Sequence, residues 1–141
     1  MPEHIPISDR IPPLGELHRT IEAEPLPDNV RAFLDDIVRR MSIAGGGVPA
    51  TMGYRGYQHS CCTSINHVIC HGIPSPKALK EGDIVNVDVT PILDGWHGDT
   101  NRTYLVGDVP LKAKRLVETT YEALALGIEQ AKPGNHLGDI A

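Results

Sequence analysis

Several features are scarce in this sequence of 141 residues, and each shortage excludes a class of protein. No apolar run approaches the roughly 20 residues of a transmembrane helix. The N-terminus is rich in proline and charge and lacks the apolar segment of a signal peptide. The net charge is −5, and lysine and arginine never form a basic block. Binding to nucleic acid or to an anionic membrane is therefore not expected.

Cysteine and aromatic residues are also few. Cys61, Cys62 and Cys70 make an odd count without paired CxxC motifs. This pattern predicts free thiols in a reducing compartment and not a disulfide framework, so the expected location is the cytoplasm. A hydrophobic content of 40% over this length suits one globular domain at most.

Proline divides the chain. Residues 1–27 hold half of the 12 prolines, which predicts an extended N-terminal arm. The remaining residues, 28–141, are expected to form the domain itself. Internal repeats and low-complexity segments are absent from the sequence.

Two stretches have helical periodicity. Apolar residues recur every three or four positions over Asp28–Ala44, which predicts an amphipathic helix with Asp28 as its N-cap. On this helix, Asp35 and Asp36 are expected on a solvated face without a chemical role. A second helix is expected over Leu111–Ala131, with its glutamates in water, and a further helix is expected to begin after Gly134.

Between the helices, short strands are expected over Thr51–Tyr57 and Asn66–Cys70, with Cys61 and Cys62 as a buried thiol pair. His59, His67 and His71 raise the question of a zinc site. His67 and His71 are four residues apart, which on a strand places them more than 10 Å apart at about 3.3 Å per residue. The spacing therefore does not favour zinc.

The strongest local pattern runs from Asp83 to Gly107. Two strand-forming segments meet at Asp94-Gly95, and an Asp-Gly pair predicts a type I′ hairpin turn because both central residues need φ > 0. Apolar and polar residues alternate along the first strand, which gives it one face to bury and one polar face: Val85, Val87, Val89 and Leu93 against Asn86, Asp88 and Thr90.

The turn also predicts the register of the hairpin. If Leu93 faces Trp96, then Asp99 faces Thr90 and lies one diagonal step from Asp88, with His97 on the same face. Diagonal neighbours are roughly 7–8 Å apart. Two carboxylates reaching inward from there could share a pair of metal ions about 3.5–4 Å apart. The alternative is that these polar residues near a hairpin simply face water.

Three motifs together resemble the type I methionine aminopeptidases. GYRGY is followed by CTSINHVICHGIP and then by LKEGDIVNVDVTPILDGWHGDT, in the order and spacing of that family. The match runs from about Val48 to Gly107 and more loosely to Ala141. Proline-specific peptidases of the same fold share the aspartate pair but not the CHGIP segment. The resemblance implies an α/β (α+β) pita-bread fold with two pseudo-symmetric halves, of which residues 28–141 match the N-terminal half.

The resemblance also implies roles for individual residues. Asp88 and Asp99 match two metal ligands. His71 matches the catalytic histidine that hydrogen-bonds the substrate near the scissile peptide bond. Three residues match the lining of the pocket for the methionine side chain: Tyr54, Tyr57 and Cys62.

The implied reaction is removal of the initiator methionine from nascent proteins. Its cofactors would be two divalent metal ions, Co, Mn, Fe or Zn, which lower the pKa of a water and polarise the peptide carbonyl. The implied substrates are the N-termini of nascent polypeptides, met near the ribosome, and the implied enzyme is a monomer.

One difference from the family limits this interpretation. The remaining ligands, one His and two Glu, belong to a second half, and no HGxG-type or IEP-type segment follows Asp99. Two of the five ligands are therefore present. The chain looks truncated and is expected to be inactive alone, the intact protein being the enzyme. The alternative is a degenerate, non-catalytic half-domain that acts as a binding module or needs a partner half.

Overall fold

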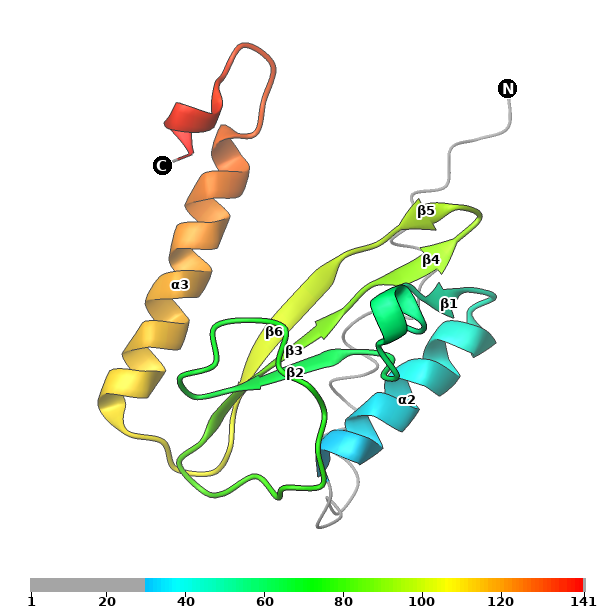
Figure 1. Cartoon of the computed structure of the whole chain (residues 1–141). Helices are drawn as coiled ribbons and strands as arrows, with labels where there is room; N and C mark the ends of the chain where they lie inside the picture. The colour runs from blue at the N-terminus through cyan, green and yellow to red at the C-terminus, as the bar shows by residue number, and fades with distance from the viewer. Residues whose placement is uncertain (1–29, 141) are drawn as a thin grey trace.

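The computed structural model describes residues 30–140 and has an α+β architecture. The helices α2 (Val30–Ala44) and α3 (Leu111–Gln130) lie to either side of the strands (Figure 1). One antiparallel sheet has the order β2-β3-β6 and the other the order β1-β4-β5. The predicted arm over 1–27 and the predicted cap Asp28 lie outside the described residues. The bounds of the strands are Val48–Pro49 (β1), Cys62–Ile65 (β2), Ile84–Val89 (β3), Pro91–Leu93 (β4), Trp96–His97 (β5) and Thr100–Leu105 (β6).

The central hairpin has the predicted turn and register. Asp94 and Gly95 have φ values of 51° and 84°, as a type I′ turn requires. Leu93 pairs with Trp96, and farther along the same register brings Asp88 opposite Asn101. The ladder is interrupted around Pro91, which has no N–H to donate, so each arm of the hairpin divides into two strands.

The apolar face of the hairpin is buried against α2. Leu34 packs with Val85 and Val87, and all three side chains are at most 3% exposed. Ile37 and Val38 pack against Cys61. Full burial of a Val or Leu side chain stabilises a fold by about 1.5–3 kcal/mol. The predicted alternation along β3 is therefore confirmed, and it leaves the polar face of the sheet on the side away from α2.

The strand predicted over Asn66–Cys70 was wrong. The strand is β2, which ends at Ile65, because Asn66 takes a left-handed conformation with φ 53°. The side chain of Asn66 makes two hydrogen bonds: its Nδ2 donates to Asp83 Oδ1 at 2.8 Å, and its Oδ1 accepts from Ile84 N at 3.0 Å. These bonds satisfy the chain locally and turn it out of the sheet.

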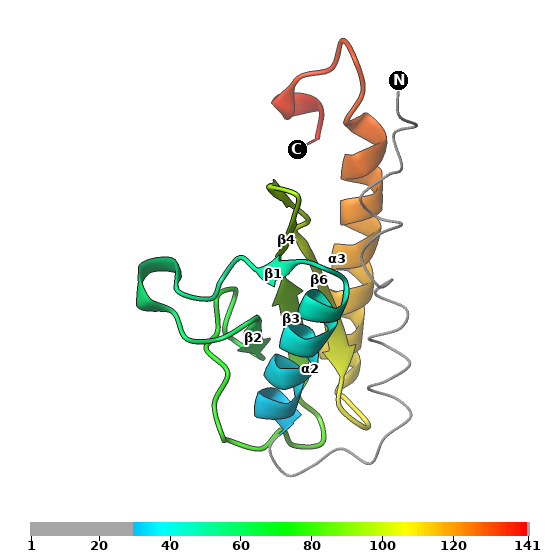
Figure 2. The same cartoon turned by 90° about the vertical axis from the view of Figure 1, so that its right-hand side faces the viewer.

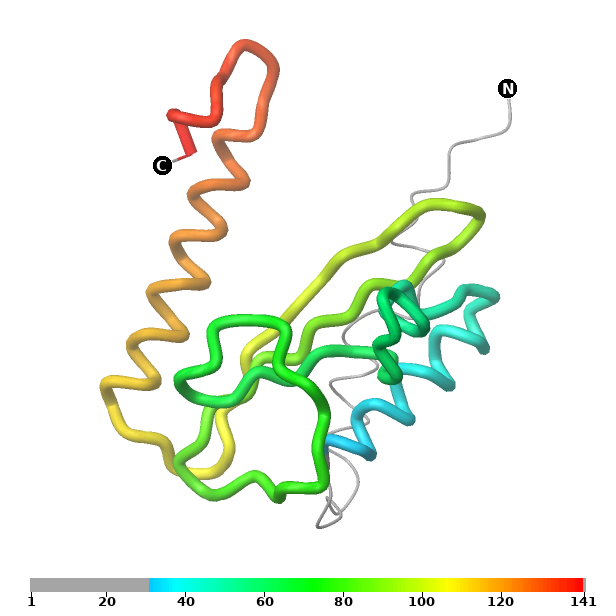
Figure 3. The backbone as a smooth tube through the Cα atoms, in the orientation of Figure 1, coloured from blue at the N-terminus to red at the C-terminus, as the bar shows by residue number. Residues whose placement is uncertain are grey.

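A long loop therefore connects β2 to β3, and its course can be followed in Figure 3. Arg31 of α2, a buried side chain, fastens the far part of this loop. Its Nε and Nη2 donate to the carbonyl oxygen of Lys77 at 3.1 and 2.8 Å. The loop returns to β2, to which Gly72 is hydrogen-bonded, and it carries His71.

The strand predicted over Thr51–Tyr57 was also wrong. This segment forms turns and the short 3-10 helix η2 (Tyr54–Gly56). Gly53, Arg55 and Gly56 have φ values of 79°, 49° and 85°, which are incompatible with a strand. The segment between β1 and β2 is thus held by side-chain contacts and not by a ladder.

Helix α3 matches its predicted bounds to within one residue, but it contributes little to the core. Its apolar residues are exposed, among them Tyr121 at 72% and Ile128 at 64%. The helix projects beyond the sheet (Figure 2). After it, a 3-10 turn, η3 (Leu137–Asp139), takes the place of the further α-helix that was predicted. In the part of the chain that the structure describes, no helix is long and apolar enough to cross a membrane.

Candidate active site

Asp88 lies in the middle of the polar face. In the register of the sheet, Cys62 of β2 and Asn101 of β6 are its direct neighbours on either side. Directly opposed residues point to the same face, so these three side chains form one row across the sheet. In the next row Asn86 lies opposite Thr103, and its amide donates to Thr103 Oγ1 at 3.1 Å and, across to the Asp88 row, to Asn101 Oδ1 at 2.9 Å.

Asp99, which directly precedes β6, lies one diagonal step from Asp88, in the neighbouring row opposite Thr90. The hydroxyl of Thr90 donates to Asp99 Oδ1 at 3.3 Å, which agrees with the register predicted for the pair. Burial raises the pKa of the Asp88 carboxyl, and the neighbouring Asp99 charge and hydrogen bond raise it further, whereas His71 lowers it. Asp99 and His71 therefore both lie within electrostatic reach of the Asp88 carboxyl.

The loop brings His71 to this position through its neighbour Gly72. Gly72 O accepts a hydrogen bond from Thr63 N at 2.7 Å, and Gly72 N donates to Ser64 Oγ at 3.1 Å. His71 itself has a left-handed φ of 56°, which is uncommon for a residue with a side chain. Such backbone strain persists where the surroundings over-determine it, as these contacts do.

Of the three predicted pocket residues, two lie together. The Tyr57 hydroxyl donates to Cys61 O at 2.9 Å and lies 3.5 Å from Cys62 Sγ. Burial and the Cys62 contact raise the pKa of Tyr57, so the hydroxyl stays a neutral donor. Tyr54 is 65% exposed, and the guanidinium of Arg55 covers its ring at 5.5 Å from the centroid.

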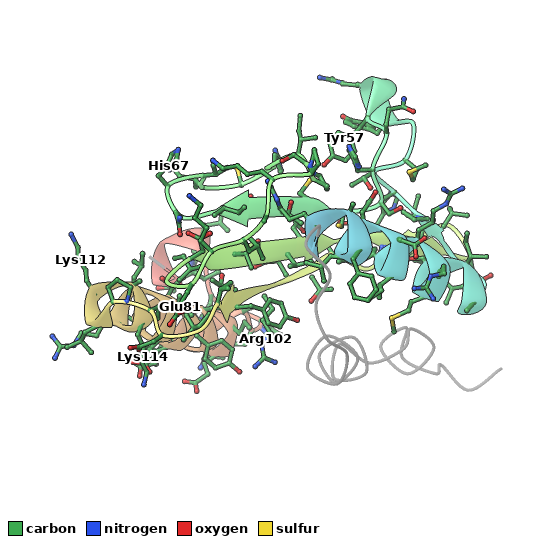
Figure 4. The ribbon with its side chains drawn as sticks, turned by 90° about the horizontal axis from the view of Figure 1, so that it is seen from below. Tyr57, His67, Glu81, Arg102, Lys112 and Lys114 are labelled. Atoms are coloured by element: carbon green, nitrogen blue, oxygen red, sulfur yellow. The ribbon has the colours of Figure 1, made fainter. Side chains whose placement is uncertain are left out.

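Figure 4 shows the two faces of the sheet. Tyr57 lies on the side that also carries the loop with His67, whereas Arg102 of β6 points to the other side. Because Cys62 lies directly opposite Asp88 in the register, Tyr57 and the carboxylates are parts of one continuous polar surface. Asp88 is half-buried in its row, whereas Asp99 is exposed.

Two adjacent carboxylates suit a divalent cation, because the like charges that raise the Asp88 pKa would be neutralised by it. Within residues 30–140, however, no group of three or more His, Cys, Asp or Glu side chains gathers closely enough to hold a metal ion. The donor set thus fits part of a metal site. His97, opposite Ile92, is exposed.

One residue of the polar network was missed from sequence. Asp35 was predicted to be solvated, and this was wrong: its Oδ2 lies 3.0 Å from His59 Nδ1 and its Oδ1 accepts from Ser60 N. The neighbouring Asp36 is exposed as predicted, in an ion pair with Arg40 at 2.8 Å. Helical periodicity alone did not distinguish Asp35 from Asp36. No local pattern in the sequence identifies the pairing of Asp35 with His59, which lies 24 residues away.

Comparison with known proteins identifies a family model and relatives that this chain is similar to. The family model described as metallopeptidase family M24 matches residues 17–141. A methionine aminopeptidase of Rickettsia prowazekii (strain Madrid E) is 56% identical over 114 residues, which cover 81% of this chain and 44% of that relative. Methionine aminopeptidase A of Synechocystis is 54% identical over 108 residues and is covered to 43%. The chain thus spans less than half the length of the curated relatives it matches.

Solved structures agree as well. The crystal structure of the methionine aminopeptidase from Thermotoga maritima superposes with a TM-score of 0.81 at 34% identity, covering 95% of this chain and 51% of that chain. The prolidase of Pyrococcus furiosus, at 22% identity and a TM-score of 0.72, shares the fold alone. The predicted fold class, the pita-bread fold, is confirmed by these neighbours. The chain belongs to metallopeptidase family M24.

Proposed function

We propose that this chain carries part of the active site of a metal-dependent methionine aminopeptidase, with Asp88 and Asp99 as metal ligands. The observation that carries the proposal is the pairing of these carboxylates on the polar face of the sheet, beside His71. The names of the relatives, methionine aminopeptidases at 56% and 54% identity, supply the reaction class.

Each residue has a task that its chemistry suits. Asp88 and Asp99 would provide oxygen ligands, and the half-buried position of Asp88 strengthens their attraction for a cation. Two bound divalent ions, Co, Mn, Fe or Zn, would supply Lewis-acid polarisation of the peptide carbonyl and of the attacking water. His71 would donate a hydrogen bond to the peptide next to the scissile bond. Its position close to Asp88 supports this role.

The methionine side chain would lie against Tyr57 and Cys62. An aromatic ring and a thiol form a polarizable surface, which a thioether contacts favourably. Tyr54, exposed at the rim, would close over the side chain from outside. This assignment rests on the contact between the Tyr57 hydroxyl and Cys62 Sγ and on the position of Cys62 opposite Asp88.

Two carboxylates do not complete the coordination of two metal ions. We therefore expect the remaining ligands, one His and two Glu, to come from the second half of the pita-bread fold, and the 141-residue chain to release no methionine by itself. The proposed substrates are nascent polypeptides with an initiator methionine, met in the cytoplasm near the ribosome by a monomeric enzyme. The three free thiols, Cys61, Cys62 and Cys70, support a reducing compartment.

A complementation assay tests the proposal. The chain is mixed with the non-matching part of the Rickettsia prowazekii relative, Mn²⁺ or Co²⁺ is added, and methionine released from a Met-Ala-Ser peptide is measured. We expect release only from the mixture, and loss of at least 100-fold with Asp88→Asn or Asp99→Asn. Asp108→Asn, an exposed carboxylate after β6, is the matched control. Unchanged release from Asp88→Asn would overturn the assignment.

A second candidate function follows from α3. Its exposed apolar side chains suit a half-domain that binds a partner polypeptide without catalysis. In the same assay this function would appear as a stable complex between the two parts that releases no methionine with any of the metals.

A further inference from the structure

The carboxylate of Asp35 reaches from α2 to the irregular segment that precedes β2. Its Oδ2 lies 3.0 Å from His59 Nδ1, and its Oδ1 accepts from Ser60 N at 2.5 Å. Cys61 Sγ lies 3.9 Å from the same Oδ1. The Asp35 side chain is only 20% exposed. A hydrogen bond with an ionised acceptor is about twice as strong as one between neutral groups, so this carboxylate is a firm anchor.

The anchored segment has no ladder of its own until β2 begins at Cys62. Side-chain contacts close it instead. The Thr51 hydroxyl donates to His59 O at 2.8 Å, and the Tyr57 hydroxyl donates to Cys61 O at 2.9 Å. The Tyr57 and His59 rings meet edge to face, with centroids 5.6 Å apart. Asp35 therefore holds the backbone from which both Tyr57 and Cys62 project.

Charge acts in the same direction as geometry. Burial raises the pKa of Cys61, and the Asp35 carboxylate raises it further. The thiol beside Asp35 thus stays neutral and does not place a second negative charge next to this carboxylate.

We propose that Asp35 is a positioning residue that holds Tyr57 and Cys62 as one wall of the pocket for the methionine side chain. The inference rests on the proposed function, since it takes Tyr57 and Cys62 as pocket residues. A slot that selects an unbranched thioether needs walls of fixed separation, and residues on irregular backbone provide these only when a second group holds them. Asp35 does not touch the substrate.

Three variants of the full chain test this role. Asp35→Ala removes both contacts. Asp35→Asn keeps an oxygen that accepts from Ser60 N and places an amide nitrogen, as a hydrogen-bond donor, beside His59 Nδ1. Asp36→Ala, on the next position of the same helix, removes an exposed carboxylate and is the matched control.

Two quantities are measured by NMR: hydrogen exchange of the Ser60 amide relative to the Val87 amide in β3, and binding of L-methionine amide, followed at the Tyr57 and Cys62 amides. With Asp35→Ala we expect Ser60 exchange to rise by about 10-fold or more relative to Val87, the factor for losing a hydrogen bond to a charged group, and methionine-amide binding to weaken by a similar factor. Asp35→Asn should restore most of both, and Asp36→Ala should change neither.

The outcomes separate the two proposals. If Asp35→Ala binds methionine amide as the wild type does, or if exchange rises equally at Ser60 and Val87, the positioning role is overturned and the proposed function stands. If the wild type shows no methionine-dependent shift at Tyr57 or Cys62, the pocket assignment fails, and the positioning role falls with it.

Discussion

Gly72 passes so close to Thr63 that a Cβ on the glycine would lie 2.2 Å from the Thr63 carbonyl oxygen. The two residues also share a hydrogen bond of 2.7 Å from Thr63 N to Gly72 O. This contact holds the loop between β2 and β3 against β2, directly next to His71. The backbone contact of Gly72 thus positions the side chain of His71, which lies in a loop and not on a helix or strand.

Replacing this glycine tests the contact. In Gly72→Ala, the Cβ forces the loop away from β2, and the bonds to Thr63 and Ser64 weaken together. We expect the free energy of unfolding to fall by about 1–3 kcal/mol, the usual cost of overpacking. Urea unfolding at pH 7 measures it. Gly138→Ala is the control, because nothing lies within 4 Å of a Cβ there. Equal stability of the two variants would contradict the close approach.

The carboxylate pair of Asp88 and Asp99 predicts that Asp88→Asn raises the free energy of unfolding without metal and removes the stabilisation by metal. Without metal, Asp88→Asn removes a like charge facing Asp99 and should raise the free energy of unfolding by about 0.5–1 kcal/mol. With Mn²⁺ at about ten times its Kd, the wild type should gain about 1.4 kcal/mol, and the variant should not. Thermal melts with and without Mn²⁺ measure both. An unchanged metal response in Asp88→Asn would exclude this residue as a ligand.

The sequence predicts the parts of this site that depend on local pattern. The Asp94-Gly95 turn determines the register, and the register alone brings Asp99 to within a diagonal step of Asp88. What could not be predicted depends on contacts between distant residues. The end of β2 depends on bonds from Asn66 to Asp83 and Ile84, 17 and 18 residues away.

Asp35 illustrates the same limit within one helix. Asp35 and Asp36 are equally polar and adjacent, and helical periodicity does not say which of them meets the segment before β2. Burial of Asp35 beside His59 and Ser60 is decided by the path of that segment. Its path depends in turn on left-handed residues such as Arg55, whose conformation no propensity predicts.

The exposed face of α3 should be measurable as hydrophobic surface. Tyr121, Leu124 and Ile128 follow one stripe and are 72%, 58% and 64% exposed. We expect the purified chain to bind a hydrophobic dye and to self-associate. Leu124→Lys with Ile128→Glu should lower dye fluorescence by at least half without lowering stability, because neither side chain is buried. Lys114→Glu, on the exposed polar surface of the helix, is the control. Equal dye binding by all three proteins would contradict an accessible stripe.

Acid should weaken the start of β3 through Asp83. The carboxylate accepts from Asn66 Nδ2 and from Lys80 N, each at 2.8 Å, and these bonds, the Asn66 bond first, lower the pKa of Asp83. In an unfolded chain an aspartate has a pKa of about 3.9. Because the folded pKa is the lower one, the contribution of Asp83 to stability is complete above about pH 4 and disappears as the pH falls through the folded pKa.

Urea unfolding between pH 6 and pH 2.5 measures this dependence. We expect stability to fall below about pH 4 in the wild type and to fall less steeply in Asp83→Asn, which has no carboxylate to protonate. Asp83→Asn should be the less stable protein at pH 6, since its amide cannot accept at both positions. Asp108→Asn should keep the wild-type slope. If Asp83→Asn keeps that slope too, the acid response arises elsewhere, and the bonds from Asn66 and Lys80 do not favour the ionised form.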